Sequence, residues 1–406
     1  MAIEPDINAA VDRGEDIGSM QPMKIDEGGP RFRDAVDLAV ELTGKSAAFR
    51  SSLPPAVRTA LADLVRAMNC YYSNLIEGHD THPIDIERAL RNDFSADPVK
   101  RDLQVEATAH IAVQEWIDRG GLAGRATSLD GLIETHRRFC EKLPATMLTV
   151  EMPGSGETVP VEPGALRRRD VQVGRHVAIS PGAVPRFLQH FAWAYGRPGK
   201  ADAIVALAAA HHRFVWIHPF LDGNGRVARL MSHAMLLDVL DTGGVWSIAR
   251  GLGRDASAYK QHLAACDLAR RNDLDGRGAL SEEALAAFTA FFLTICIDQV
   301  DFMAGLVEPD QLRPRIHRWA AEETERGTLP PKAVNIIDAV LYRGELPRGE
   351  VEAVVGTGDR QARRLTSALV DLGVLVSESS RAPLRIAFPA TLASRWMPGL
   401  FPDRRA

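Results

Sequence analysis

The segment HPFLDGNGRVAR, residues 218–229, sets a histidine, an aspartate and two arginines around two glycines. His218 is the only group in this segment expected to titrate near neutral pH, which suits a general base. Asp222 could hold a divalent cation against phosphate oxygens, and Mg²⁺ is the usual partner of one carboxylate plus phosphates. The residue types therefore suit transfer of a phosphate-containing group.

The two glycines come just before a predicted helix. Gly223 and Gly225 allow the loop to close around an anion, because a Cβ atom would obstruct such turns. The first turn of a helix exposes unpaired N–H groups and the positive end of the helix dipole. Arg226 and Arg229 stand three residues apart there, so both can face the same anion.

Two common types of site fit the segment less well. A Walker-type phosphate loop needs GxxxxGK[ST], which the sequence lacks. A zinc site from His211, His212 and His218 is conceivable, but adjacent histidines point to different faces of a helix and the i, i+4 pair is missing. Taken singly, His218 would more often be a packed histidine and each arginine a solvated one. Their conjunction favours a functional site.

Composition indicates a globular protein of more than one domain. The chain has 406 residues and a net charge of -5, which argues against a protein that coats nucleic acid along its whole length. Four cysteines without paired spacing predict reduced thiols and a cytoplasmic location. We expect no signal peptide and no membrane association, since the longest apolar stretch, 284–297, is shorter than the roughly 20 residues of a spanning helix.

The segments around the motif are mostly helical by periodicity. Residues 1–30, rich in Gly, Asp, Glu and Pro, are predicted to be a mobile tail. Residues 151–185 carry glycines and prolines around short β-branched alternations, which predicts a loop and a small hairpin. Helices are predicted over about 54–78, 105–121, 128–144, 183–196, 201–218 and 227–240.

The chain from Pro331 onward forms a separate predicted unit. Three helical segments followed by a hairpin fit a winged helix-turn-helix. Residues 331–406 contain 11 Lys+Arg and 8 Asp+Glu, a local charge of +3 against -8 for the rest. Arg360, Arg363 and Arg364 open the third helix, which makes DNA a candidate partner, although a solvated basic face accounts for them equally well.

The segment HPFLDGNGRVAR matches the Fic family motif HPFx[D/E]GNGRxxR at every fixed position, and the chain resembles this family over roughly half its length. The resembling part includes the helix with His136 and continues to about Leu263. Fic proteins are α-helical enzymes that transfer AMP from ATP to a hydroxyl on a target protein and release pyrophosphate. The resemblance therefore implies a mostly α fold with a Fic-type helical core and a small β-hairpin flap.

The resemblance also implies a role for each residue of the motif. His218 would deprotonate the attacking Ser, Thr or Tyr hydroxyl, Phe220 would anchor the loop in the core, and Asp222 would ligate Mg²⁺ between the α- and β-phosphates. Further contacts to ATP are implied for an anion hole of Gly223, Asn224 and Gly225, for Arg226 at the phosphates and for Arg229 at the γ-phosphate. The related Doc toxins carry lysine in place of Gly225 and bind ATP reversed, so glycine implies the AMP-transferring orientation.

Two further segments resemble parts of Fic proteins. The hairpin VGRHVAIS resembles the Fic flap, whose exposed edge would take a target segment as an added strand along Val177, Ala178 and Ile179. The alternative is an ordinary surface hairpin. GRDASAYKQHL resembles the family pattern NRxxYYxxL near the adenine but departs from it at Ala258, and it assigns Tyr259 to the nucleotide.

An upstream segment, SNLIEG, matches the Fic inhibitory pattern [S/T]xxxE[G/N] at Ser73, Glu77 and Gly78. Ser73 and Glu77 are one helical turn apart and can face the same way. In the family this glutamate pairs with the second motif arginine, here Arg229, and blocks productive placement of ATP. The alternative is a solvated glutamate.

These observations predict an autoinhibited protein adenylyltransferase with ATP as substrate and Mg²⁺ as cofactor. Its partners would be a target protein and the chain itself, by auto-modification, and a homodimer is a further expectation. Three alternatives stay open: removal of AMP, transfer of another phosphate-containing group, and a nucleotide-sensing DNA-binding regulator. The predicted domains are a tail over 1–30, a helical region with the inhibitory helix over 31–115, a Fic catalytic core over 116–300 and a winged-helix-like domain over 310–406.

Overall fold

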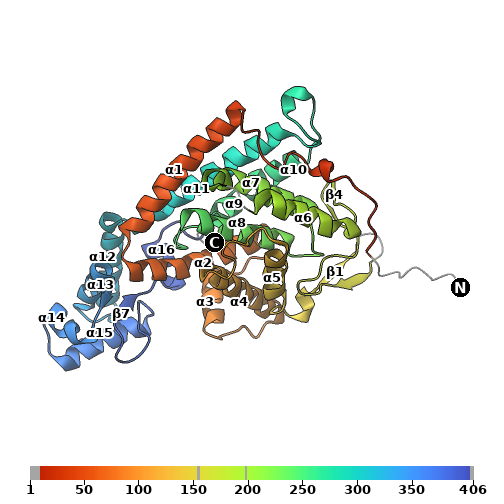
Figure 1. Ribbon diagram of the computed structural model, residues 1–406. Helices are drawn as coiled ribbons and strands as arrows, with labels where there is room; N and C mark the ends of the chain where they lie inside the picture. Colours follow the sequence, from red (N-terminus) through yellow and green to blue (C-terminus); the bar gives the residue numbers. More distant parts are fainter. Residues whose placement is uncertain (1–9, 153–155, 197–198, 403–406) are drawn as a thin grey trace.

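The computed structural model describes residues 10–152, 156–196 and 199–402, and helices dominate it (Figure 1). The helices are α1 (Pro30–Ser52), α2 (Pro55–Ile76), α3 (Pro83–Leu90), α4 (Pro98–Asp118), α5 (Leu129–Cys140), α6 (Val184–Tyr195), α7 (Lys200–Ile217), α8 (Asn224–Leu240), α9 (Ala249–Arg254), α10 (Ala256–Cys266), α11 (Glu282–Val307), α12 (Pro309–Glu325), α13 (Ala333–Arg343), α14 (Val351–Val355), α15 (Asp359–Asp371) and α16 (Ala393–Trp396). The strands are β1 (Thr149–Glu151), β2 (Thr158–Pro160), β3 (Gln172–Val173), β4 (His176–Val177), β5 (Glu345–Leu346), β6 (Leu375–Val376) and β7 (Leu384–Ile386).

Helices α7 and α8 form the centre of the molecule. Nearly every residue of α7 from Ala203 to Ile217 is buried, as expected for a helix that is apolar on all sides. It packs against α6, α8 and α11, and α8 also contacts α4 and α5. Figure 1 shows the pair between α1 and α11 on one side and α2 to α5 on the other. The connection between α7 and α8 is therefore held by the core at both ends.

Helix α11 contains the apolar stretch 284–297. Among the described residues it is the one helix long and apolar enough, by length and composition, to cross a membrane. Its residues Phe288, Phe292 and Cys296 are buried, and it packs along α1, α7 and α10.

Residues 10–29 differ from the mobile tail predicted over 1–30. Met20, Met23 and Ile25 are buried against the core, and the hydroxyl of Tyr195 donates to the Met23 carbonyl over 2.5 Å. Burial of these three apolar side chains stabilises the packed segment. The prediction of a mobile tail rested on the Gly, Asp, Glu and Pro content and did not take them into account. Residues 1–9, the rest of the predicted tail, lie outside the described residues.

The glycine- and proline-rich stretch forms two small hairpins where one was predicted. β1 pairs with β2, and β3 pairs with β4 through a two-residue turn. The second pair is the predicted flap hairpin.

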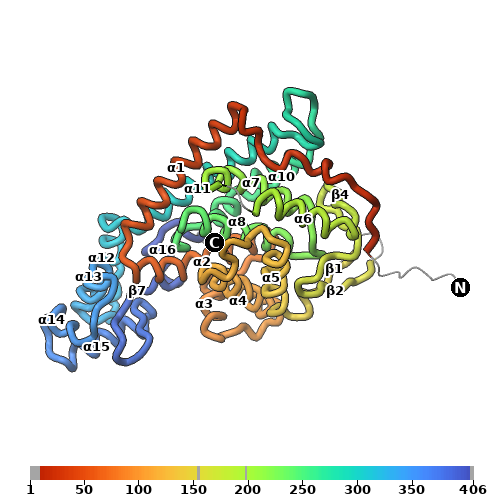
Figure 2. Tube along the Cα trace, in the orientation of Figure 1, coloured from red at the N-terminus to blue at the C-terminus, as the bar shows by residue number. Residues whose placement is uncertain are grey.

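The C-terminal unit has the predicted order of three helices and a hairpin. α13, α14 and α15 precede β6 and β7, and a short strand β5 after α13 joins the sheet in the order β5-β7-β6. Strand β5 was not predicted, because two residues are too short to show an alternating pattern. In Figure 2 this blue unit lies at the end of the molecule away from the N-terminus, and β7 contacts α2.

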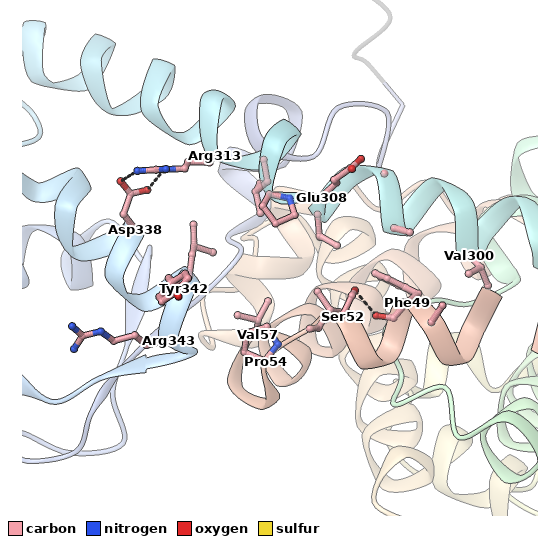
Figure 3. Close-up of a pocket in the computed structure, with 18 of the residues that line it drawn as sticks. Phe49, Ser52, Pro54, Val57, Val300, Glu308, Arg313, Asp338, Tyr342 and Arg343 are labelled. Carbon is pink, nitrogen blue, oxygen red and sulfur yellow. Dashed lines mark hydrogen bonds and ion pairs between the residues drawn. The ribbon is translucent and has the colours of Figure 1, made fainter. Parts of the chain in front are cut away.

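A groove of about 1160 Å³ lies where the C-terminal unit meets α1 and α11 (Figure 3). Its wall is largely apolar and includes Phe49, Val57, Leu312 and Tyr342. Its lining residues do not include the 218–229 segment, so this groove is separate from the candidate chemistry.

Candidate active site

The loop between α7 and α8 is closed by its own side chains. α7 ends at Ile217 and is followed by His218, whose backbone is left-handed at φ 51°, and Gly223, at φ 81°, precedes α8. The side-chain amide of Asn224 accepts from the Phe220 N–H over 3.0 Å and donates to the Phe220 carbonyl over 2.9 Å. The fully buried Phe220 ring stacks on His136 with centroids 3.9 Å apart. The side chain of Asn224 therefore shapes the loop, and its backbone N–H belongs to the first turn of α8, where N–H groups have no partner within the helix.

His218 carries a neutral imidazole. Its Nδ1 lies 3.3 Å from the Val215 carbonyl, and because a carbonyl only accepts, Nδ1 carries the hydrogen and Nε2 is left as the basic nitrogen. Burial, together with the charge of Arg167, lowers the pKa of His218 to about 4. The sequence-based expectation of titration near neutrality is wrong, because it assumed a solvated ring.

Arg226 lies between two carboxylates. It forms an ion pair with Glu106 and a second one with Asp222 Oδ2 at 3.1 Å. Glu106 is fully buried and also binds His79 Nδ1 at 2.8 Å. Without Arg226 and His79 as partners, burial of the Glu106 charge would be costly. Neither Glu106 nor His79 was predicted from the sequence, because α4 carries several other polar residues and gives no sign of which of them is buried.

Arg229 is held by the predicted inhibitory segment. Its Nε donates to Ser73 Oγ over 2.9 Å, and its second terminal nitrogen donates to the Ser73 carbonyl over 3.1 Å and to Glu77 Oε1 over 2.5 Å. Burial acts to raise the pKa of Glu77, but the neighbouring Arg229 outweighs it and lowers the pKa of that carboxyl. The side chain of Lys260 also donates to the Ile76 carbonyl, next to Glu77. The structure therefore brings together the residues of the two motifs.

Gly225 makes room for this contact. A Cβ atom built at Gly225 would overlap Glu77 Oε1 and press on Arg229. From the sequence, Gly225 was linked to the anion hole and to the orientation of ATP, and the structure adds that glycine at this position lets Glu77 reach Arg229.

Tyr259, which the resemblance assigns to the nucleotide, lies in the core beside Arg229, and that assignment stays a prediction. Its side chain is buried, its hydroxyl lies 2.6 Å from His211 Nε2, and burial raises its pKa to about 12. The other ring nitrogen of His211 donates to Ser232 Oγ on α8 over 2.9 Å. Tyr259 therefore supports α8 through His211.

The flap hairpin exposes one of its three predicted docking side chains. Val177 is 65% exposed, whereas the side chains of Ala178 and Ile179 are buried, and docking of a target along these residues stays a prediction. The Ala178 N–H donates inward to the Val171 carbonyl over 3.2 Å. Since backbone groups alternate along an antiparallel strand, those of Val177 point to the outer edge.

Comparison with known proteins supports the resemblance found in the sequence. The model of the Fic/DOC family matches residues 126–236, which contain the whole 218–229 segment. A protein adenylyltransferase Fic from Drosophila grimshawi is 29% identical over 190 residues, 45% of this chain and 36% of that protein. The same-named protein from Drosophila mojavensis is 27% identical over 215 residues, 51% of this chain and 40% of that protein. The chain thus spans well under half the length of these curated relatives.

Solved structures agree on the fold. A Fic family protein from Desulfovibrio desulfuricans G20 superposes with a TM-score of 0.51 at 17% identity and covers 90% of this chain and 98% of its own. Fic-1 (aa134–508) from C. elegans gives a TM-score of 0.50 at 16% identity over 67% of this chain and 72% of its own. Residues 126–236, which carry the family motif on the loop between α7 and α8, therefore match the Fic/DOC family, and the helical fold around that loop is similar to that of solved Fic-family structures.

Proposed function

We propose that this protein transfers AMP from ATP to a Ser, Thr or Tyr hydroxyl of a target protein, including its own chain, and that Glu77 restrains the reaction. The observation that carries the proposal is the neutral His218, with Nε2 unprotonated, at the end of α7 in the loop that leads to the N-terminus of α8. The matched relatives are named protein adenylyltransferases, which supports the same reaction class.

The residues of the loop would divide the work of the reaction. The N–H groups in the first turn of α8 and the guanidinium of Arg226 would hold phosphate oxygens. His218 Nε2 would take the proton of the hydroxyl as its oxygen bonds to the α-phosphorus. The bond from the α-phosphorus to the bridging oxygen breaks, and pyrophosphate leaves. Catalysis is then mainly positioning plus stabilisation of developing charge.

The donor set at Asp222 fits Mg²⁺. Its side chain is half-exposed, and the described residues contain no cluster of three or more His, Cys, Asp or Glu that could hold a metal ion. A lone carboxylate suits an ion that completes its shell with phosphate oxygens and water. When bound, Mg²⁺ would neutralise negative charge on the phosphates.

Glu77 would restrain the reaction through Arg229. A guanidinium that already donates to Glu77 and to Ser73 has fewer donors for a γ-phosphate. ATP would then bind with its α-phosphate out of line with the incoming hydroxyl, and a misplacement of about 1 Å can cost roughly 10²-fold in rate.

The decisive test uses labelled ATP. The full-length protein is incubated with Mg²⁺ and ATP labelled at either the α or the γ position, beside the His218→Ala variant as control. We expect label on protein from the α position alone and none in the variant. Label from the γ position would mean kinase chemistry, and label from neither position in wild type and in Glu77→Gly would refute the proposal.

A further inference from the structure

Arg167 is a buried arginine whose hydrogen bonds all go to main-chain carbonyls of the loop and the hairpin. It is 3% exposed, and its guanidinium donates to His218 O over 2.7 Å and to Ile179 O over 2.5 Å. Weaker or more local bonds reach Ile217 O at 3.4 Å and Arg169 O at 3.0 Å. One side chain therefore ties the end of α7 to the base of the β3–β4 hairpin.

The backbone of Arg167 adds a further bond to the same loop. Its N–H donates to the Pro219 carbonyl over 2.9 Å, so Arg167 binds both residues that follow α7. His218 needs such support, because a left-handed backbone is strained for a residue with a side chain and persists only where its surroundings hold it. The direction of the His218 ring depends on this backbone.

The charge of Arg167 acts on the same histidine. Burial is the largest effect on the pKa of His218 and lowers it. The hydrogen bond to the Val215 carbonyl and the charge of Asp222 raise this pKa, whereas Arg167 and His176 lower it further. A positive charge at this point helps keep the imidazole unprotonated and so able to accept a proton.

We propose that Arg167 is a positioning residue that fixes the general base His218 and the target-docking hairpin relative to each other. The target hydroxyl would be presented by the hairpin, whereas the base belongs to the α7–α8 loop. Their separation must be constant for proton transfer, and Arg167 is bonded to both. The inference rests on the proposed adenylyltransfer but concerns a residue outside the family motif.

Two substitutions of Arg167 separate the effect of its hydrogen bonds to the loop and the hairpin from the effect of its charge. In a Glu77→Gly background, Arg167→Lys keeps a positive charge but lacks the planar fork that spans two carbonyls, and Arg167→Met removes both. The matched control is Arg168→Met, a neighbouring exposed arginine. For each protein we would measure the auto-modification rate at saturating α-labelled ATP, the ATP concentration for half-maximal rate, and the NMR titration of His218, assigned by its loss in His218→Ala.

We expect both Arg167 variants to lose rate by roughly 10²-fold, the scale of a 1 Å positioning error, at an unchanged half-maximal ATP concentration. The His218 titration should stay low in Arg167→Lys and rise in Arg167→Met, and Arg168→Met should match the parent. A full rate in Arg167→Lys, or a Met variant identical to the control, would overturn the inference. An Arg167→Met variant whose rate falls only in proportion to its folded fraction would also overturn the inference, because the loss would then be one of stability.

Failure of the proposed function would look different. A Glu77→Gly parent that takes up no α-label would refute adenylyltransfer. The NMR titration needs no activity, so a rise of the His218 titration in Arg167→Met alone would still support the contact of Arg167 with the histidine. No rise in that variant would overturn it.

Discussion

The carboxylate of Glu77 meets the guanidinium of Arg229 at 2.5 Å, at the point where Gly225 leaves no side chain in the way. Ser73, one turn earlier on α2, accepts two more hydrogen bonds from the same arginine. Arg229 itself is almost fully buried, so it has little freedom to serve another partner while α2 stays in place.

Glu77→Gly should raise auto-modification by one to two orders of magnitude. The substitution frees Arg229 for the γ-phosphate and removes a positioning penalty of roughly 10²-fold. Incorporation of α-label over time measures the gain. Glu27→Gly, an exposed glutamate, should give none. If Glu77→Gly and wild type incorporate label equally, Glu77 does not restrain the reaction.

A control for this gain removes Arg229 as well. The double variant Glu77→Gly with Arg229→Ala should fall back to the wild-type level or below, because the freed arginine is what the gain requires. A double variant as active as Glu77→Gly would show that Glu77 acts by another route.

Gly225→Ala should expose the coupling to Glu77 in a stability cycle. In a helix, Ala is favoured over Gly by about 1 kcal/mol, so the substitution should stabilise the Glu77→Gly protein. In wild type the new Cβ meets Glu77 Oε1 and should cancel that gain or reverse it. Urea denaturation of the four proteins measures the difference. Identical effects in both backgrounds would contradict the close approach.

The helices around the motif were predicted from helical periodicity, and the loop between them from the segment 218–229. Both signals lie within short stretches of the sequence. The pairing of Glu77 with Arg229 came from the family resemblance and lies as the resemblance implies. The partners Glu106 and Arg167 could not be foreseen, since they meet the loop across 51 residues or more and their burial leaves no periodic trace. The burial of Tyr259 could not be predicted either, because a sequence pattern gives the residue type and not its exposure.

The rate of transfer should stay nearly constant between pH 6 and 8 and fall only as the pH drops through about 4 to 5. His218 has a pKa lowered to about 4 by burial, so it remains an unprotonated base above that value and is protonated below it. Initial rates of α-label incorporation in Glu77→Gly across this range measure the profile. A midpoint near 6.5 would mean that the ring is solvated in the reacting state.

The control for this profile is His218→Ala, which should lower the rate by about 10²–10⁴-fold, the usual cost of losing a general base, with ATP binding nearly unchanged. The histidine acts on the target hydroxyl and not on the nucleotide, so binding of fluorescent ATP should separate the two effects. A variant that keeps more than a tenth of the parent rate would exclude His218 as the base.

Asp222→Ala should weaken the dependence of the rate on Mg²⁺, because the carboxylate would be lost as a ligand. Asp222 also contacts Arg226, so Asp222→Asn serves as the matched control: it keeps an oxygen for Arg226 but loses the charge. Both variants should need more Mg²⁺ for half-maximal rate. If Asp222→Asn behaves as the parent, the residue holds Arg226 and not the ion.

Truncation before Gly399 should raise auto-modification, because the C-terminal segment packs on the helix that carries Glu77. Tyr72 on α2 donates to the Leu400 carbonyl over 3.1 Å, and the ring of Tyr71 meets Phe401 edge to face at 5.6 Å. Without these contacts α2 is less firmly held, and the bond from Glu77 to Arg229 should open more often.

The gain in rate from this truncation should approach but not exceed the gain from Glu77→Gly. In a Glu77→Gly background the truncation should give no further gain, because both changes act on Arg229. A longer truncation, which removes the chain from Pro331 onward, should also leave auto-modification measurable. Circular dichroism checks that each truncated protein is folded. A folded but inactive protein would mean that the C-terminal unit belongs to the catalytic machinery, and additive gains would mean that the tail acts elsewhere than on α2.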